Sequence, residues 1–122
     1  MKTASRAGEW TEVCRLDDIV PNTGVCALVG GEQVAVFRLD DDSLYAISNH
    51  DPFSRANVLS RGIVGDLKGE LVVASPVYKQ HFSLITGRCL EDEAVRVAVF
   101  PVRREDATIF VRAKAGGTGA DE

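Results

Sequence analysis

Residues 25–48 read VCALVGGEQVAVFRLDDDSLYAIS, and this stretch decides the fold class. The apolar runs VCALV and QVAVFRL flank the pair Gly30-Gly31, and glycine tolerates the positive φ angles of a tight hairpin turn. Three aspartates at 40–42 form a polar turn, after which residues 43–48 return as a third β-prone segment. The pattern predicts a three-stranded antiparallel meander.

Outside the meander, short β-prone segments alternate with turn residues at intervals of about eight to twelve positions. We expect further strands at residues 9–15, 63–65, 71–75, 94–102 and 108–112, and a hairpin over residues 75–90 whose turn closes at Thr86-Gly87. No segment shows a sustained helical period. About nine short strands predict an all-β domain, an antiparallel barrel or sandwich.

The chain has 122 residues, of which 45% are hydrophobic, enough for one core without disulfide support. We expect a single domain over residues 9–113, preceded by a flexible arm at residues 1–8. Residues 114–122 are rich in glycine and charge and offer almost nothing to bury, so we expect a disordered tail there.

Charge and hydropathy limit the partners of this chain. The formal charge of −4 argues against nucleic acid or an anionic membrane surface, because such binders need a basic face. The sequence shows no signal-peptide core and no run approaching the roughly 18 apolar residues of a membrane span. We therefore expect a cytoplasmic protein with a protein or small-molecule partner.

The three cysteines Cys14, Cys26 and Cys89 are widely separated and lack CxxC spacing, so we expect reduced thiols. Cys14 and Cys26 fall in apolar strand patterns that predict core positions. His81 can change charge near neutral pH, but no nucleophile, carboxylate pair or oxyanion loop accompanies it. We therefore expect no catalytic residue on this chain.

Two loops stand apart from the strands. The first reads His50-Asp51-Pro52-Phe53, and the second reads Ser75-Pro76-Val77-Tyr78 and runs on through Phe82 to Thr86-Gly87. Together they resemble the paired ligand loops of Rieske iron–sulfur proteins, in which C-x-H in one loop and C-x-x-H in the other hold the cluster. The two prolines, the Phe and the Thr-Gly turn keep that frame.

The resemblance implies that all four cluster ligands are replaced, by Asp51, Phe53, Ser75 and Tyr78. A Rieske centre needs two thiolates and two imidazoles, which oxygen donors and a phenyl ring do not reproduce. We therefore expect no metal and no cofactor on this chain. We hypothesise that the Asp51 carboxylate accepts a hydrogen bond from Ser75, Tyr78 or backbone N–H groups, and that Phe53 and Tyr78 fill the former ligand positions.

The resemblance extends through NVLSRGIVGD at residues 57–66 and GRCLED at residues 87–92, and covers most of the chain. In these features the sequence is similar to the small-subunit family of assimilatory NADH-dependent nitrite reductases. The resemblance implies a non-catalytic subunit that supports a large catalytic subunit. That partner would carry FAD, siroheme and an iron–sulfur cluster and use NADH to reduce nitrite to ammonium by six electrons.

Exposed loops commonly carry function, and side chains at the loop tips are therefore candidates for contacts with the partner. These candidates are His50, Phe53, Arg55, Tyr78, Lys79 and His81. Two alternatives stay open at this point. A Rieske-type ferredoxin would bind iron and carry electrons, whereas a free-standing β-barrel module would bind a small molecule with the same loops.

Overall fold

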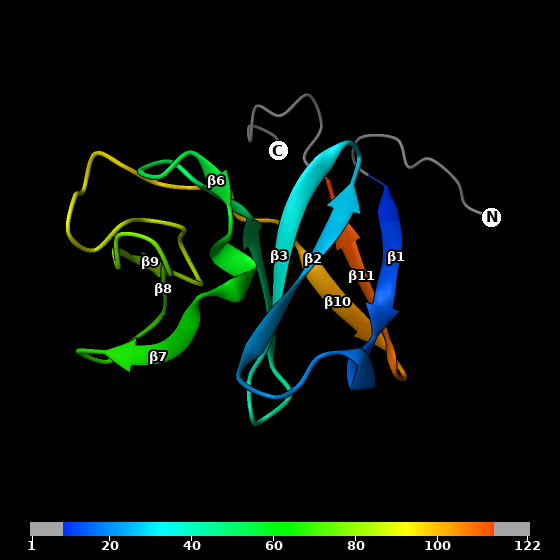
Figure 1. The fold of residues 1–122 in the computed structure, drawn as a ribbon. Helices are drawn as coiled ribbons and strands as arrows, with labels where there is room; N and C mark the ends of the chain where they lie inside the picture. The colour runs from blue at the N-terminus through cyan, green and yellow to red at the C-terminus, as the bar shows by residue number, and fades with distance from the viewer. Residues whose placement is uncertain (1–8, 114–122) are drawn as a thin grey trace.

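The computed structural model describes residues 9–113, which form eleven short strands and two 3₁₀ helices. The expected arm (residues 1–8) and tail (residues 114–122) lie outside the described residues. Figure 1 shows a larger half that contains β1, β2, β3, β10 and β11 beside a smaller half that contains β6 to β9. Neither helix within residues 9–113 is long and apolar enough to cross a membrane. The described domain is all-β, as the sequence predicts.

Two antiparallel three-stranded sheets build the larger half. One consists of β1 (Trp10–Arg15), β11 (Thr108–Arg112) and β10 (Val102–Glu105), in that order. After η1 (Leu16–Asp18), the other consists of β2 (Thr23–Val29), β3 (Glu32–Arg38) and β4 (Leu44–Ser48). The predicted meander is confirmed, and its hairpin turn has φ angles of 56° at Gly30 and 83° at Gly31.

The smaller half begins with the hairpin of β5 (His50–Asp51) and β6 (Ala56–Asn57), within a stretch that the sequence analysis assigns to loops. After η2 (Leu59–Arg61), the strands β7 (Ile63–Leu67), β8 (Glu70–Ala74) and β9 (His81–Ser83) form a third three-stranded sheet. The predicted second hairpin is present, but its return arm at residues 88–90 contributes single bridges instead of a strand.

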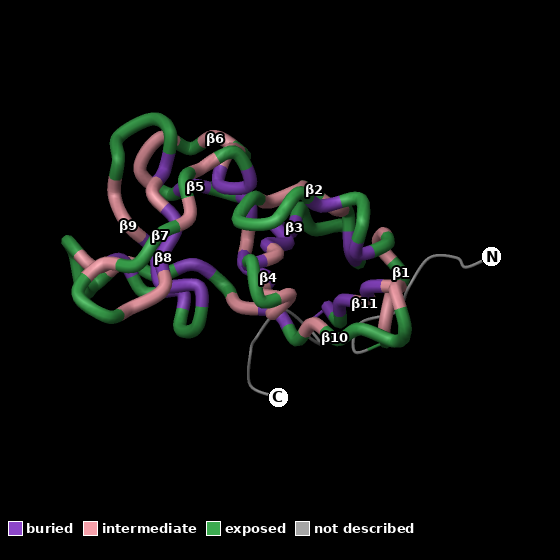
Figure 2. Tube along the Cα trace, turned by 90° about the horizontal axis from the view of Figure 1, so that it is seen from below, coloured by how far each residue is buried: buried purple, intermediate pink, exposed green. Residues whose placement is uncertain are grey.

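Strand β3 lies between two hydrophobic cores. Successive side chains of a strand point to opposite faces, so Val34 and Val36 enter one core while Ala35 and Phe37 enter the other. The first core fills the larger half, and the second joins β3 and β4 to Phe82 and its neighbours in the smaller half. Figure 2 shows the buried segments of β3 and β4 between the two halves. The second core, shared by both halves, thus attaches the smaller half to the larger half.

The expected strand at residues 94–102 is wrong. In this segment Val97 donates its backbone N–H to Gly87 in the smaller half, whereas Phe100 donates to Ala46 in the larger half. The segment crosses from one sheet to the other and forms only isolated bridges with each. Its alternating valines reflect packing into the second core along this crossing, and the regular strand β10 begins only at Val102.

All three cysteines lie among the described residues and are free. Cys14 is half-buried, but Cys26 is exposed, and its predicted core position is wrong. Strand β2 lies at the edge of its sheet, and Cys26 and Leu28 share its exposed face. An apolar strand pattern therefore overstates the burial of this cysteine.

Candidate functional site: the paired loops

The first loop is a tight turn organised by the side chain and the carbonyl of Asp51. Asp51 Oδ1 accepts a hydrogen bond from the Phe53 N–H at 2.9 Å, and its backbone carbonyl accepts one from the Arg55 N–H at 2.7 Å. Arg55 closes the turn in the left-handed region with φ 61°. An Asp-Pro pair favours such a turn because the Asp side chain bonds the backbone two residues on and proline supplies the next φ angle.

The second loop repeats this design with Ser75 in place of Asp51. Ser75 Oγ accepts a hydrogen bond from the Val77 N–H at 3.3 Å, and its carbonyl accepts one from the Lys79 N–H at 3.1 Å. Lys79 occupies the same place as Arg55 and also has a positive φ, 69°. The two loops are therefore two copies of one capped turn, each ending in a basic residue.

The two turns are joined at their first residues. Ser75 Oγ donates a hydrogen bond to Asp51 Oδ2 at 2.5 Å, and neither residue has any exposed surface. Burial raises the pKa of Asp51, but hydrogen bonds, chiefly those from Ser75 and the Phe53 N–H, lower it and leave it below its ordinary value. The predicted acceptor role of Asp51 toward Ser75 and backbone N–H groups is confirmed, and the buried carboxylate is stabilised as an anion.

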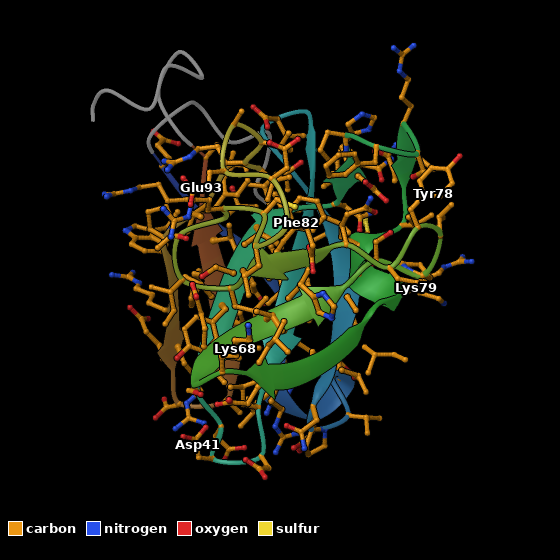
Figure 3. All side chains as sticks on the ribbon, turned by 90° about the vertical axis from the view of Figure 1, so that its left-hand side faces the viewer. Asp41, Lys68, Tyr78, Lys79, Phe82 and Glu93 are labelled. Carbon is orange, nitrogen blue, oxygen red and sulfur yellow. The ribbon has the colours of Figure 1, made fainter. Side chains whose placement is uncertain are left out.

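The two aromatic residues of the loops face different ways. The Phe53 ring packs against the fully buried Phe82, with a centroid distance of 6.1 Å and an interplanar angle of 46°. Tyr78 is 60% exposed, so the expectation that it fills a former ligand position by packing is wrong. Figure 3 shows Tyr78 at the edge of the molecule, well away from Phe82 in the interior.

The two histidines also differ. His50 is exposed, and its Nδ1 lies 3.1 Å from Asn57 Oδ1 across the β5–β6 hairpin. His81 Nδ1 lies 2.6 Å from Glu91 Oε2, and Glu91 Oε1 accepts a hydrogen bond from the His81 N–H at 2.8 Å. Burial raises the pKa of Glu91, but its bonds to His81 leave the pKa lowered. Glu91 therefore holds both the backbone and the ring of His81 at the base of the loop, whereas His50 is exposed and has one side-chain partner, Asn57.

Two residues that anchor the loops were not predicted from the sequence. Glu91 is one, and Asn49 is the other: it is 2% exposed and precedes the first loop. Asn49 Nδ2 donates to the Asn57 carbonyl at 3.0 Å, and its Oδ1 accepts from the Ser60 N–H at 2.7 Å. A single Asn or Glu beside a strand has no periodic signal, and only its position directly before or after a loop motif marks it.

The donor set of the loops does not fit an iron–sulfur cluster. Both oxygens of Asp51 and the Ser75 hydroxyl are already engaged in hydrogen bonds, Phe53 has no lone pair, and Tyr78 presents a phenol to solvent. A Rieske cluster needs thiolates on one iron and imidazoles on the other. Across residues 9–113, no group of three or more His, Cys, Asp or Glu side chains is arranged to hold a metal ion. The turn pair is thus cross-linked by oxygen atoms of the protein itself.

The domain is all-β, and its two proline-containing loops meet at the hydrogen bond from Ser75 to Asp51, with no soft ligand there; this is the loop arrangement of a Rieske-like domain without cluster ligands. Comparison with known proteins agrees with this class. Residues 9–112 match the Rieske-like [2Fe-2S] domain family. The nitrite reductase (NADH) small subunit of Salmonella typhimurium is 51% identical over 105 residues, which cover 85% of this chain and 97% of that protein.

A solved structure agrees as well. The crystal structure of a putative NADH-dependent nitrite reductase small subunit from Mycobacterium tuberculosis superposes with a TM-score of 0.82 at 49% identity, covering 85% of this chain and 94% of that one. The chain belongs to the Rieske-like [2Fe-2S] domain family and, within it, to the small subunits of NADH-dependent nitrite reductase.

A third relative differs in its architecture. The nitrite reductase (NAD(P)H) large subunit of Klebsiella oxytoca is 42% identical over 102 residues, which cover 84% of this chain but only 11% of that protein. A domain like this chain is therefore a separate small subunit in some relatives and part of a large subunit in another.

Proposed function

We propose that this chain is the non-catalytic small subunit of an NADH-dependent nitrite reductase and acts by binding the large catalytic subunit. The observation that carries the proposal is the identity of about half the residues over nearly the whole length of named small subunits. The relative from Klebsiella oxytoca adds support, because a domain fused in one protein and separate in another commonly works beside the same partner.

The loop chemistry fits an accessory role. Electron transfer through a Rieske centre requires soft sulfur and nitrogen donors, and the paired loops supply a carboxylate, a hydroxyl, a phenyl ring and an exposed phenol. The Rieske-type ferredoxin alternative is therefore disfavoured by the donor set. FAD, siroheme, an iron–sulfur cluster and the NADH site are assigned by this proposal to the large subunit, where nitrite would take up six electrons to give ammonium.

The identity of the reductant also supports a cellular location for the complex. NADH is a cytoplasmic reductant, and a subunit that serves an NADH-dependent enzyme would work where that cofactor is maintained. We therefore assign the complex to the cytoplasm. The free-standing β-barrel module remains as the rival, with a dissociable small molecule in place of the protein partner.

The test is an affinity purification of the tagged chain from nitrate-grown source cells, with mass spectrometry and a visible spectrum of the eluate. We expect a large protein with flavin and siroheme absorption to co-elute, and NADH-dependent nitrite reduction by that protein to depend on the small chain. Recovery of the chain alone and colourless from cells that contain the large subunit would refute the proposal and favour the free-standing module.

A further inference from the structure

We propose that the tips of the two loops form one docking surface, apolar at its centre and basic at its rim, that fits an acidic-rimmed recess on the large subunit. We call it the tip surface and define it by Val77, Tyr78, Arg55 and Lys79. The inference rests on the proposed function, and it specifies where the partner binds and what chemistry the partner presents.

The centre of the tip surface is apolar and held in place. Val77 is 44% exposed and Tyr78 60% exposed, and the two residues are adjacent in one turn. Both residues lie in the turn that Ser75 closes, because its hydroxyl accepts a hydrogen bond from the Val77 N–H and its carbonyl accepts one from the Lys79 N–H. Ser75 in turn donates a hydrogen bond to the buried Asp51. An exposed aromatic side chain on a rigid turn loses little conformational entropy on binding and is a common anchor of protein interfaces.

The rim of the tip surface is basic. Arg55 and Lys79 occupy equivalent positions at the ends of the two turns, and both are exposed. Within residues 9–113, neither side chain forms an ion pair with a carboxylate, whereas Arg38 and Arg103 do. The one carboxylate of the two turns, Asp51, is completely buried. The tip surface is therefore positively charged on a chain whose net charge is −4.

Two exposed acidic side chains, Asp41 and Glu93, lie away from the tip surface. Figure 3 shows Asp41, in the acidic turn between β3 and β4, and Glu93, in the segment after β9, on the side of the molecule away from Tyr78 and Lys79. Such an uneven distribution orients the chain in the field of a charged partner and favours approach with the basic tip toward carboxylates. Two cations are too few for a polyanion such as nucleic acid, so a protein surface is the occupant that fits.

The relative from Klebsiella oxytoca supports the large subunit as the source of that surface. A domain like this chain occupies 11% of that large subunit and therefore lies permanently close to the rest of it. A chain made separately needs its own affinity to reach the same partner. Electrostatic steering by Arg55 and Lys79, followed by insertion of Tyr78, would supply it.

The experiment measures binding of the full chain to the cofactor-loaded large subunit by surface plasmon resonance at several salt concentrations. The charge-reversal double variant Arg55→Glu/Lys79→Glu is expected to lower the association rate about tenfold at low salt and to flatten its salt dependence. Lys68→Glu is the matched control for each single reversal, Arg55→Glu or Lys79→Glu, because it changes the net charge by the same amount. Lys68 is exposed, has a positive φ of 56° and lies in the turn of the β7–β8 hairpin, at the end away from the second loop. Lys68→Glu should change the rate less than about twofold.

The apolar centre is tested in the same assay. Tyr78→Ala is expected to raise the dissociation rate about thirtyfold, as for an interface anchor. Leu28→Ala is its control, because Leu28 is 69% exposed on β2 in the other half of the molecule, and it should leave the rate unchanged. Melting curves equal to that of the wild type establish that each variant is folded.

The outcomes separate the two proposals. Failure of the wild-type chain to bind the large subunit would refute the proposed function itself. Wild-type binding that is unaffected by the tip variants, or is weakened equally by Lys68→Glu and Leu28→Ala, would overturn the tip surface and leave the proposed function standing.

Discussion

The two loops of this domain share one backbone design and differ in where their side chains face. Each begins with a buried acceptor, Asp51 or Ser75, and each closes with a backbone hydrogen bond four residues on. The first loop turns Phe53 inward against Phe82, whereas the second exposes Tyr78. In related proteins a metal cluster holds both loops. Here the first loop, residues 51–55, packs its aromatic side chain into the core, and we call it the anchoring loop; the second, residues 75–79, exposes its aromatic side chain, and we call it the displayed loop.

The difference shows how such a frame is kept without a metal. The Ser75 to Asp51 hydrogen bond crosses between the loops, and charge-assisted hydrogen bonds of this kind are short and roughly twice as strong as neutral ones. Packing of Phe53 supports the anchoring loop from one side only. The displayed loop therefore depends on Asp51 for its position and on its own turn for its shape, so removal of the Asp51 carboxylate should disturb both loops.

Asp51→Ala is expected to have the largest effect. It leaves the buried Ser75 hydroxyl and the Phe53 N–H without their acceptor, which costs about 3 kcal/mol. For a domain of this size that lowers the melting temperature by about 10–20 °C, measured by circular dichroism. Asp41→Ala is the control, because this carboxylate also caps a turn but is exposed and should matter little. Equal melting curves for Asp51→Ala and wild type would mean that the cross-link does not hold the loops.

The sequence was sufficient for the meander and for the two loops, because both depend on local chemistry. Alternating apolar residues around Gly30-Gly31 specify a hairpin wherever it lies, and Asp-Pro and Ser-Pro specify capped turns. The acceptor role of Asp51 was likewise predictable from the vacancy that a missing ligand would leave. The meander and the turns need no knowledge of distant partners, whereas the bond from Ser75 to Asp51 crosses between the loops and was predicted from the resemblance to Rieske loops.

The sequence was insufficient where a segment's partner decides its structure. Residues 94–102 alternate like a strand, yet Val97 and Phe100 bond to different halves of the molecule and no continuous ladder forms. The exposure of Tyr78 was mispredicted because an aromatic side chain packs or is displayed according to which way its turn faces. Asn49 and Glu91 were missed because single polar residues carry no pattern, although each holds a loop in place.

Alanine substitutions of the two loop aromatics, Phe53 and Tyr78, should give a smaller effect. Phe53→Ala removes the contact with Phe82 from the second core and should cost about 1–2 kcal/mol of unfolding free energy. Tyr78→Ala removes a side chain that is mostly in solvent and should cost less than about 0.5 kcal/mol. Urea unfolding of both variants measures the difference. Equal losses would show that Tyr78 packs against the domain in solution and that the two loops are not divided in role.

The smallest expected effect is the change in acid stability when the hydrogen bond from Ser75 to Asp51 is removed. The pKa of the Asp51 carboxyl is lower in the folded state than in the unfolded state, where it is near 3.8. The stabilisation from the Asp51 anion is therefore complete above the unfolded pKa. It is lost as the pH falls from there through the lower folded pKa. The Ser75 bond is part of what lowers this pKa, so Ser75→Ala should make the loss of stability on acidification shallower.

The measurement is the urea midpoint between about pH 5 and about pH 2.5, the range around and below the ordinary carboxyl pKa. Glu91 and Asp41 also have lowered pKa values and add their own acid dependence. The comparison is therefore made in a Glu91→Gln/Asp41→Asn background, in which these two carboxylates no longer contribute to the acid dependence. A Ser75→Ala profile parallel to that of its parent would show that the serine does not stabilise the Asp51 anion. The two loops would then be held together by packing alone.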